Sequence, residues 1–451
     1  MAAEYTEEVQ TYIEHLKHFI QFPTVSDEND LNIDFRPFMD FHRYLQKTYP
    51  VLHRKFKNEV IGKANLLYHY SSAHPSGKLP VLLMAHQDVV PVGDTEGWSD
   101  DPFSGNVHDG AIWGRGATDC KNVILSELEA VEYLFTEGFD PDFDIYLAYS
   151  YNEEVQSRNK GAEAIVETLY ERDIRLGAVF DEGSGPSRSE IDEYKSIVNI
   201  ISLGEKALQD YEIYAESEGG HSMAPGRGTA LGRVAAAVSK LEAEPFPYRL
   251  IPLVKEELRS KAKQYSGHIR EIYEEPEKYF DELIDLSKTD KLLDSHLHTT
   301  IAITQAYGSE RSNILPTRAG FIVNVRLLEG DNEETVIKHF REVLPEDIKI
   351  KKLSGDNPTK STLPEGREYD LIQKAVSKVY DVSEESVITI PSYLAGGTDS
   401  RYYRRISDNV FIYSGIFHDG KSGGAHGYNE HFSISNIDTG IRFFTEYLKL
   451  Y

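Results

Sequence analysis

The sequence contains a single cysteine, Cys120, in 451 residues. One thiol cannot form a disulfide within the chain, which fits a reducing compartment. No segment approaches the roughly 18 apolar residues of a membrane span, and the acidic N-terminus lacks the apolar stretch of a signal peptide. We therefore expect a cytoplasmic protein without membrane partners.

Basic residues are also scarce, because 48 Lys and Arg stand against 74 Asp and Glu, a formal net charge of −26. Such a surface repels phosphate backbones and anionic lipids, so nucleic acid is not an expected partner. It favours the local enrichment of cations. The length, together with 40% hydrophobic residues, is sufficient for a large core and two domains.

Short apolar runs alternate with helical patterns in the first part of the chain and again after about Pro364. This alternation predicts an α/β fold, with a sheet that carries helices on both faces. The clearest strand candidates are residues 81–86, 143–154, 176–183, 387–391 and 409–416.

The middle of the chain follows another pattern. Residues 203–358 read as strand, helix, strand, strand, helix and strand, with a charge-rich helical segment at 252–295 after the first helix. This order is typical of a ferredoxin-like α+β domain. We expect it to be inserted into a first domain made of residues 1–202 and 359–451.

Histidine and acidic residues stand at the ends of the first three strand candidates. The first ends at His86, with Asp88 two residues on. The second is followed by Glu153 and Glu154, and the third reaches Asp181. A lone His-x-Asp is usually a structural pair, but open α/β sheets bind their ligands at strand ends, and buried, unpaired acids are costly. Three acidic ends beside one histidine therefore indicate bound metal.

Asp119 and a second histidine extend this candidate site. Asp119 stands just before a predicted helix, where it could equally be an N-cap. Two divalent ions would need a second histidine, and His426, His431 and His418 are the candidates near the C-terminus. Two cations about 3.5 Å apart lower the pKa of a shared water, and a free carboxylate can carry the proton to a leaving amine.

Several segments, in order along almost the whole chain, carry a family resemblance. They are "HQDVVPV", "WGRGATDCKN", "NEEV", "DEG", "GGHSMAP", "SNILPTRAGFIVNVR", "GGTDSR" and "HGYNE". Together they resemble the di-zinc metallopeptidase family of aminoacylases, glutamate carboxypeptidases, succinyl-diaminopimelate desuccinylases and Gly-Xaa carboxypeptidases. The amino-acid sequence of these motifs is most similar to that of the Gly-Xaa carboxypeptidase branch, which also has a long helical insert. The resemblance implies a zinc-peptidase-like mixed sheet flanked by helices, and an inserted lid or dimerisation domain.

The resemblance also implies roles for single residues. Glu153 would be the general base on a metal-bridging water, and Asp88 would orient His86. Co²⁺ or Mn²⁺ could replace zinc. Where the family usually has Asp-Asp-Lys, this chain has Cys120 in the middle, which we expect to pack beside the site, although a thiol there could instead sense oxidation. The implied ligands of the two zinc ions are His86 and Asp181 for one, Glu154 and His426 for the other, and Asp119 as the bridge.

Substrate recognition is also expected from the resemblance. His221 would donate to the oxyanion of the tetrahedral intermediate; in dimeric relatives it does so across the subunit boundary, so a homodimer is implied. Taken alone, this histidine would simply belong to a turn that caps a helix. The residues expected to hold a substrate carboxylate are Asn313, Arg326, Gly396, Gly397 and Thr398.

These features predict a metal-dependent hydrolase that cleaves an amide bond beside a free carboxylate, in a small peptide or an N-acyl amino acid. Carboxypeptidase, dipeptidase and N-acyl-amino-acid deacylase activities all remain open. A non-catalytic binding paralogue of the same fold is the alternative from another class. It would lack a metal ligand or Glu153, and this sequence keeps all of them.

Overall fold

The computed structural model describes residues 5–155, 160–189 and 196–451. The chain divides into two compact units. The first contains Met1–Leu203, Thr362–Pro391 and Thr398–Tyr451, and the second contains Gly204–Ser361 and Ser392–Gly397. The segment 392–397 departs from the predicted boundaries, since the sequence placed it in the first domain.

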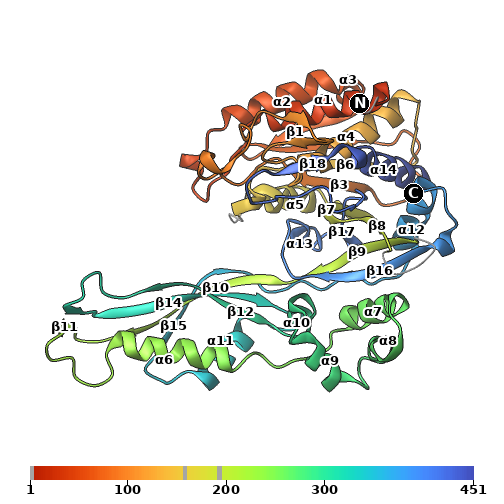
Figure 1. The fold of residues 1–451 in the computed structure, drawn as a ribbon. Helices are drawn as coiled ribbons and strands as arrows, with labels where there is room; N and C mark the ends of the chain where they lie inside the picture. Colours follow the sequence, from red (N-terminus) through yellow and green to blue (C-terminus); the bar gives the residue numbers. More distant parts are fainter. Residues whose placement is uncertain (1–4, 156–159, 190–195) are drawn as a thin grey trace. The chain divides into compact units, whose positions relative to one another are not determined.

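A nine-stranded mixed sheet forms the centre of the first unit (Figure 1). Its strands lie in the order β1-β2-β6-β3-β7-β17-β9-β16, and β8 pairs with β9. Neighbours are parallel from β6 through β3 and β7 to β17, and antiparallel where β1 meets β2, β2 meets β6 and β17 meets β9. The strand bounds are β1 Lys57–Ile61, β2 Asn65–Tyr70, β3 Val81–His86, β6 Ile145–Ser150, β7 Ala178–Ser184, β8 Pro186–Arg188, β9 Ile197–Glu205, β16 Val387–Leu394 and β17 Val410–Tyr413.

Helices cover both faces of this sheet, so the α/β fold expected from the sequence is confirmed (Figure 1). On one face, α4 contacts β3, and both α1 and α14 contact α4. On the other, Leu82 and Met84 of β3 share a buried cluster with Ile165 and Val166 of α5. The helix bounds are α1 Glu7–Ile20, α2 Arg36–Thr48, α3 Pro50–Lys55, α4 Lys121–Thr136, α5 Gly161–Glu171, α12 Arg367–Val379, α13 Ser400–Tyr403 and α14 Thr439–Leu450.

The second unit contains a four-stranded antiparallel sheet in the order β12-β14-β10-β15. Along the chain β10, α6, β12, β14, α11 and β15 follow one another, which is the ferredoxin-like succession of elements. Alternation along β10 buries Tyr211 and Ile213, which pack with Val234 of α6 and Phe340 of α11. The bounds are β10 Ala207–Glu216, α6 Ala230–Ala243, β12 Thr300–Tyr307, β14 Arg318–Leu327, α11 Glu333–Val343 and β15 Lys349–Gly355.

The charge-rich segment between α6 and β12 is helical, as its sequence suggested. Its helices are α7 Pro252–Lys261, α8 Gly267–Glu274, α9 Phe280–Ser287 and α10 Lys291–Leu297.

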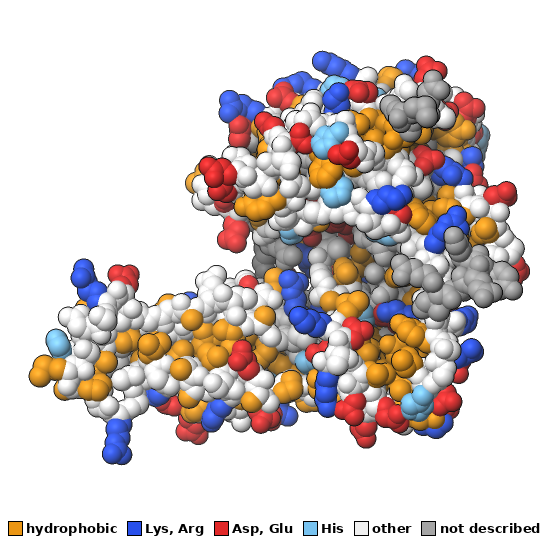
Figure 2. Space-filling view, viewed as in Figure 1, with side chains coloured by type: hydrophobic (Ala, Val, Ile, Leu, Met, Phe, Trp, Pro, Cys, Tyr) orange, Lys and Arg blue, Asp and Glu red, His pale blue; other side chains and the backbone are white. Residues whose placement is uncertain are grey.

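Acidic and basic side chains are interspersed over the face of the protein shown in Figure 2. Within the described parts of the chain, no helix is both long enough and apolar enough to cross a membrane.

Candidate metal centre

Three parallel strands of the first unit end at the same edge of the sheet. β3 ends at His86, which pairs with Ser150, the last residue of β6. On the other side of β3, β7 carries Asp181 and Glu182. Because parallel strands leave the sheet at one edge, side chains from distant parts of the sequence meet there.

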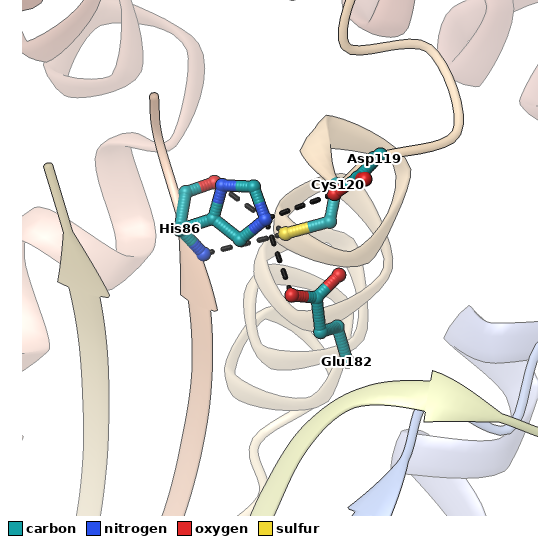
Figure 3. Close-up of side chains that lie close together, drawn as sticks. All are labelled: His86, Asp119, Cys120 and Glu182. Atoms are coloured by element: carbon teal, nitrogen blue, oxygen red, sulfur yellow. Dashed lines mark hydrogen bonds and ion pairs between the residues drawn. The ribbon is translucent and has the colours of Figure 1, made fainter. Parts of the chain in front are cut away.

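One ring nitrogen of His86 contacts the local backbone, and the other faces two carboxylates. Its Nδ1 donates to the backbone oxygen of Asp88 at 2.9 Å, since a carbonyl oxygen can only accept. Nε2 lies 3.0 Å from Asp119 Oδ1 and 3.2 Å from Glu182 Oε1 (Figure 3), and in a neutral ring this nitrogen carries the lone pair. This arrangement needs either a second proton on the ring or a cation between the three groups.

A second cluster shares Asp119. Nε2 of His426 lies 3.1 Å from Asp119 Oδ2 and 2.9 Å from Glu154 Oε2. In each cluster the potential ligand atoms lie within 4.8 Å of one another. His426 has a φ of 58°, a backbone conformation that residues other than glycine rarely adopt, so its loop is held in a specific conformation by its surroundings.

Asp119 does not cap α4. The capping position belongs to Cys120, which makes no side-chain capping bond, and the Asp119 carboxylate faces the two histidines instead. The buried thiol of Cys120 accepts the backbone amide of His86 at 3.3 Å. Cys120 therefore packs directly against the first cluster, and Figure 3 shows its sulfur beside the imidazole.

The structure directs Asp181 away from His86. Its two carboxylate oxygens accept the backbone amides of Glu182 at 2.8 Å and Ser400 at 2.9 Å. Successive residues of a strand point to opposite faces, so Glu182 turns toward His86 where Asp181 cannot. In this structure Glu182, rather than Asp181, lies beside His86, so Glu182 joins Asp181 as a candidate ligand, and the assignment of Asp181 stays a prediction.

Asp88 holds the acidic turn that follows β6. Its fully buried carboxylate accepts the backbone amides of Glu153 at 3.1 Å and Glu154 at 3.2 Å, and the hydroxyl of Ser26 at 2.6 Å. The distance from Asp88 Oδ1 to His86 Nδ1 is 3.6 Å, longer than a hydrogen bond. Asp88 therefore orients the histidine through its carbonyl oxygen, and the two glutamates through its side chain.

Burial makes this edge of the sheet unfavourable for so much negative charge. Desolvation raises the pKa of Glu153 well above its ordinary value, and it raises the pKa of Glu154 to about 7. Asp399 accepts the hydroxyl of Ser150 at 2.6 Å, and burial raises its pKa to about 6. These carboxylates would release their protons more readily beside added positive charge.

Arg401 carries a positive charge close to Asp399, while two basic side chains that flank Asp119 in the sequence are bound to other partners. Nζ of Lys121 donates to the backbone oxygens of Phe19 and Phe22 at 2.9 and 2.7 Å, and Arg115 donates to Glu430 at 2.7 Å. Imidazole nitrogens and carboxylate oxygens are suitable ligands for zinc and related divalent ions. The donor set and its surplus of negative charge therefore fit a pair of metal ions.

The structure distinguishes among the three candidate histidines. Only His426 of these reaches the described carboxylates of the two clusters. His431 begins β18 (His431–Ser433), stacks on Trp113 and donates from Nδ1 to the backbone oxygen of Asn429. The backbone amide of His418 donates to the backbone oxygen of Pro186 in β8 at 2.8 Å.

Sequence reasoning missed Glu182, Asp399 and Glu430. Glu182 was hidden because "VFDEG" offers two adjacent acids, and only the register of β7 decides between them. Asp399 lies in "GGTDSR" and Glu430 in "HGYNE". Both residues lie inside motifs that the sequence analysis had singled out. An acidic residue next to a glycine-rich turn was the sequence feature that could have identified them.

Most of the candidate substrate residues belong to the second unit. The backbone oxygen of Asn313 accepts the amide of Ser222 at 3.0 Å, which places His221 and Asn313 side by side in the small β11-β13 sheet (Gly220–His221 with Ile314–Leu315). Both side chains are exposed.

The remaining candidates are divided between the units. Arg326 lies half-buried on β14, and Gly396 and Gly397 follow β16. Thr398 belongs to the first unit, where its hydroxyl accepts the amide of Ser400 at 3.2 Å. A role for the second unit's residues at the metal clusters stays a prediction.

The fold and the site together define the class of this protein: an α/β protein with a candidate two-metal centre at the ends of its parallel strands. The chain belongs to peptidase family M20/M25/M40, whose family model matches residues 82–450. The metallopeptidase resemblance expected from the motifs is thereby confirmed, and the protein is a hydrolase of this family.

Known relatives cover nearly the whole chain. N-fatty-acyl-amino acid synthase/hydrolase PM20D1 of Mus musculus is 29% identical over 456 residues, 99% of this chain and 89% of that protein. Carboxypeptidase S of Saccharomyces cerevisiae is 28% identical over 485 residues, 97% of this chain and 83% of that protein. Among solved structures, the M20 family metallo-carboxypeptidase Sso-CP2 from Sulfolobus solfataricus shares the fold, with a TM-score of 0.72, 20% identity and 99% of each chain covered.

Proposed function

We propose that the protein is a two-metal amide hydrolase that cleaves a peptide or N-acyl bond beside a free carboxylate. One observation carries this proposal. The carboxylate of Asp119 lies between two histidines, with Oδ1 3.0 Å from Nε2 of His86 and Oδ2 3.1 Å from Nε2 of His426. A carboxylate that faces two ligand clusters in this way is suited to bridge two ions.

Three side chains are assigned to each metal position. Zinc suits this mixture of imidazole and carboxylate, and Co²⁺ or Mn²⁺ could substitute. When bound, such a pair of ions supplies an activated water and polarises the substrate carbonyl. The first position has His86, Asp119 and Glu182, with the thiol of Cys120 beside them, and the second has Asp119, Glu154 and His426.

Glu153 is the proposed general base. It belongs to neither ligand cluster among the described residues, yet it directly precedes Glu154, and Asp88 holds its amide at 3.1 Å. Neighbouring side chains diverge, so one glutamate can bind metal while the other accepts the proton of the attacking water. Glu153 would then deliver this proton to the leaving amine.

The substrate's free carboxylate is assigned to the second unit and its following loop, on the strength of the resemblance. Arg326 would grip it with two parallel hydrogen bonds, supported by Asn313 and by Gly396, Gly397 and Thr398. His221 would donate to the oxyanion, from the partner subunit if the chain forms the implied homodimer. A formal charge of −26 makes such local donors necessary for binding an anion.

The proposed chemistry is common to two relatives. One is named for N-fatty-acyl amino acids and the other for carboxypeptidase activity, and both names describe an amide beside a free carboxylate. The retained ligand clusters and Glu153 disfavour a non-catalytic paralogue. The cytoplasm is the proposed setting, on the evidence of the single cysteine.

The test is a hydrolysis screen on protein whose metal content has been measured. Dipeptides and N-acyl amino acids are offered in parallel, each also as its carboxyl-terminal amide. We expect cleavage of at least one class of free acid, loss of that activity with a chelator and recovery with Zn²⁺. Protein that carries two ions and cleaves none of these compounds would contradict the proposal.

A further inference from the structure

Glu430 is a buried carboxylate that joins two loops of the first unit. It lies between the glycine-rich loop that carries His426 and the start of β18, and it is 0% exposed. Its Oε2 accepts Nη1 of Arg115 at 2.7 Å and the backbone amide of Gly116 at 3.0 Å.

The other oxygen of Glu430 binds the residues next to α4. Oε1 accepts the backbone amides of Thr118 at 2.9 Å and Asp119 at 3.1 Å. The backbone oxygen of Glu430 accepts the amide of Gly114 at 2.9 Å, and the hydroxyl of Thr118 donates to the backbone oxygen of His431 at 2.8 Å. One side chain therefore holds most of the segment that leads into the shared ligand.

This segment depends on those bonds for its shape. Residues 114–120 lie between β5 (Ala111–Trp113) and α4, outside the helices and strands, so no regular ladder fixes their backbone. Both carboxylate oxygens of Glu430 accept hydrogen bonds from this segment, and Glu430 belongs to neither ligand cluster among the described residues. Its function is therefore to position groups rather than to bind metal.

We propose that Glu430 is a positioning residue of the metal centre, one that fixes the Asp119 loop against the His426 loop so that the Asp119 carboxylate reaches both metal positions. This inference rests on the proposed function. The second position takes both Asp119 and His426 from the two joined loops, whereas the first takes only Asp119 from them and takes His86 and Glu182 from strands. Loss of Glu430 therefore weakens the second position more than the first.

The test is a Zn²⁺ titration of the metal-free protein by calorimetry, for the wild type and for Glu430→Gln. Glutamine keeps the volume, but its amide nitrogen cannot accept, so the donors on one side lose their acceptor. We expect two ions in the wild type. In the variant, the affinity for one ion should fall by about 10–100-fold, the range seen when groups behind metal ligands are removed, while the affinity for the other ion, which shares only Asp119 with the joined loops, should fall less.

Glu132→Gln is the matched control. Glu132 also accepts two backbone amides, those of Val51 at 2.9 Å and Leu52 at 2.7 Å, but neither belongs to a ligand cluster. We expect this variant to lose thermal stability and to bind both ions with wild-type affinity. In Glu430→Gln, turnover should recover at saturating Zn²⁺, which a general loss of structure would not allow.

Arg115→Lys decides the question if Glu430→Gln does not fold. Arg115 also donates from Nη2 to the backbone oxygen of Gly427 at 3.0 Å. Lysine should therefore weaken the same connection between the Asp119 and His426 loops, and lower the affinity for one ion by less than Glu430→Gln does. A folded Glu430→Gln or Arg115→Lys protein that binds both ions as the wild type does would overturn the positioning role alone. A wild type that binds fewer than two ions would overturn the proposed function and this inference with it.

Discussion

The carboxylate of Glu182 lies 3.2 Å from Nε2 of His86, while that of the adjacent Asp181 is bound to backbone amides. The acid of β7 that faces His86 is therefore one residue later than the ligand that the resemblance implied, and we propose Glu182 as the ligand. Because the two acids face different groups, their replacements should have different effects.

Glu182→Gln should lower the affinity of the protein for zinc by at least about tenfold, since it removes the anionic ligand opposite His86. Asp181→Asn should keep both ions and instead lower the free energy of unfolding by about 1–3 kcal/mol, because one buried amide loses its acceptor. Metal analysis and chemical denaturation of both variants check this. The reverse pattern would restore Asp181 as the ligand.

Glu153→Gln should retain zinc and lose about 10²–10⁴-fold in turnover, because glutamine cannot accept the proton of the attacking water. Its KM should change little. Glu154→Gln should lose metal first, since Glu154 Oε2 lies 2.9 Å from His426. Measurements of zinc content and kcat distinguish the Glu153→Gln variant from the Glu154→Gln variant. An exchange of these phenotypes would exchange the roles, and a fully active, metal-loaded Glu153→Gln would refute the mechanism.

Arg326→Lys should raise KM for a free-acid substrate by about 10–100-fold and leave kcat within a few-fold. Lysine cannot reproduce the two-pronged contact of a guanidinium with a carboxylate, and a hydrogen bond to a charged group contributes about 1.5–3 kcal/mol. Arg318→Lys is the control on the same strand, since Arg318 binds Glu212 at 2.7 Å. Equal kinetics in both variants would remove Arg326 from the substrate site.

The free energy of unfolding should decrease as the pH is lowered, because of His42. Burial lowers the pKa of its imidazole to about 4, and Nε2 binds Oε1 of Gln87 at 2.7 Å. As pH falls below 6.5, the unfolded chain takes up a proton that the folded chain refuses, so stability is lost between pH 6.5 and about 4. The loss from pH 7.5 to 5 should be about 2 kcal/mol.

His42→Gln should flatten that part of the pH dependence. Denaturant midpoints at several pH values compare it with the wild type and with His74→Gln, a change at an exposed histidine. Identical slopes in all three proteins would show that His42 does not control acid stability.

Much of the fold followed from local pattern. The run from Val81 to His86 is a strand because it is short, apolar and bounded by polar residues, and the same signal located β6 and β7. The helical insert was recognisable from its periodicity and charge. The membership of 392–397 in the second unit was not predictable, because it depends on which neighbours a strand end contacts after folding.

What the sequence by itself determined was the chemistry available: histidine and acids at successive strand ends, in the order of a known family of metal hydrolases. Only the tertiary structure decided which groups meet. It places Glu182, rather than Asp181, beside His86, and His426, rather than His431, beside Asp119. Sequence spacing specifies the direction of a side chain only along its own strand or helix. Distances between different elements arise from packing, and metal ligation depends on those distances.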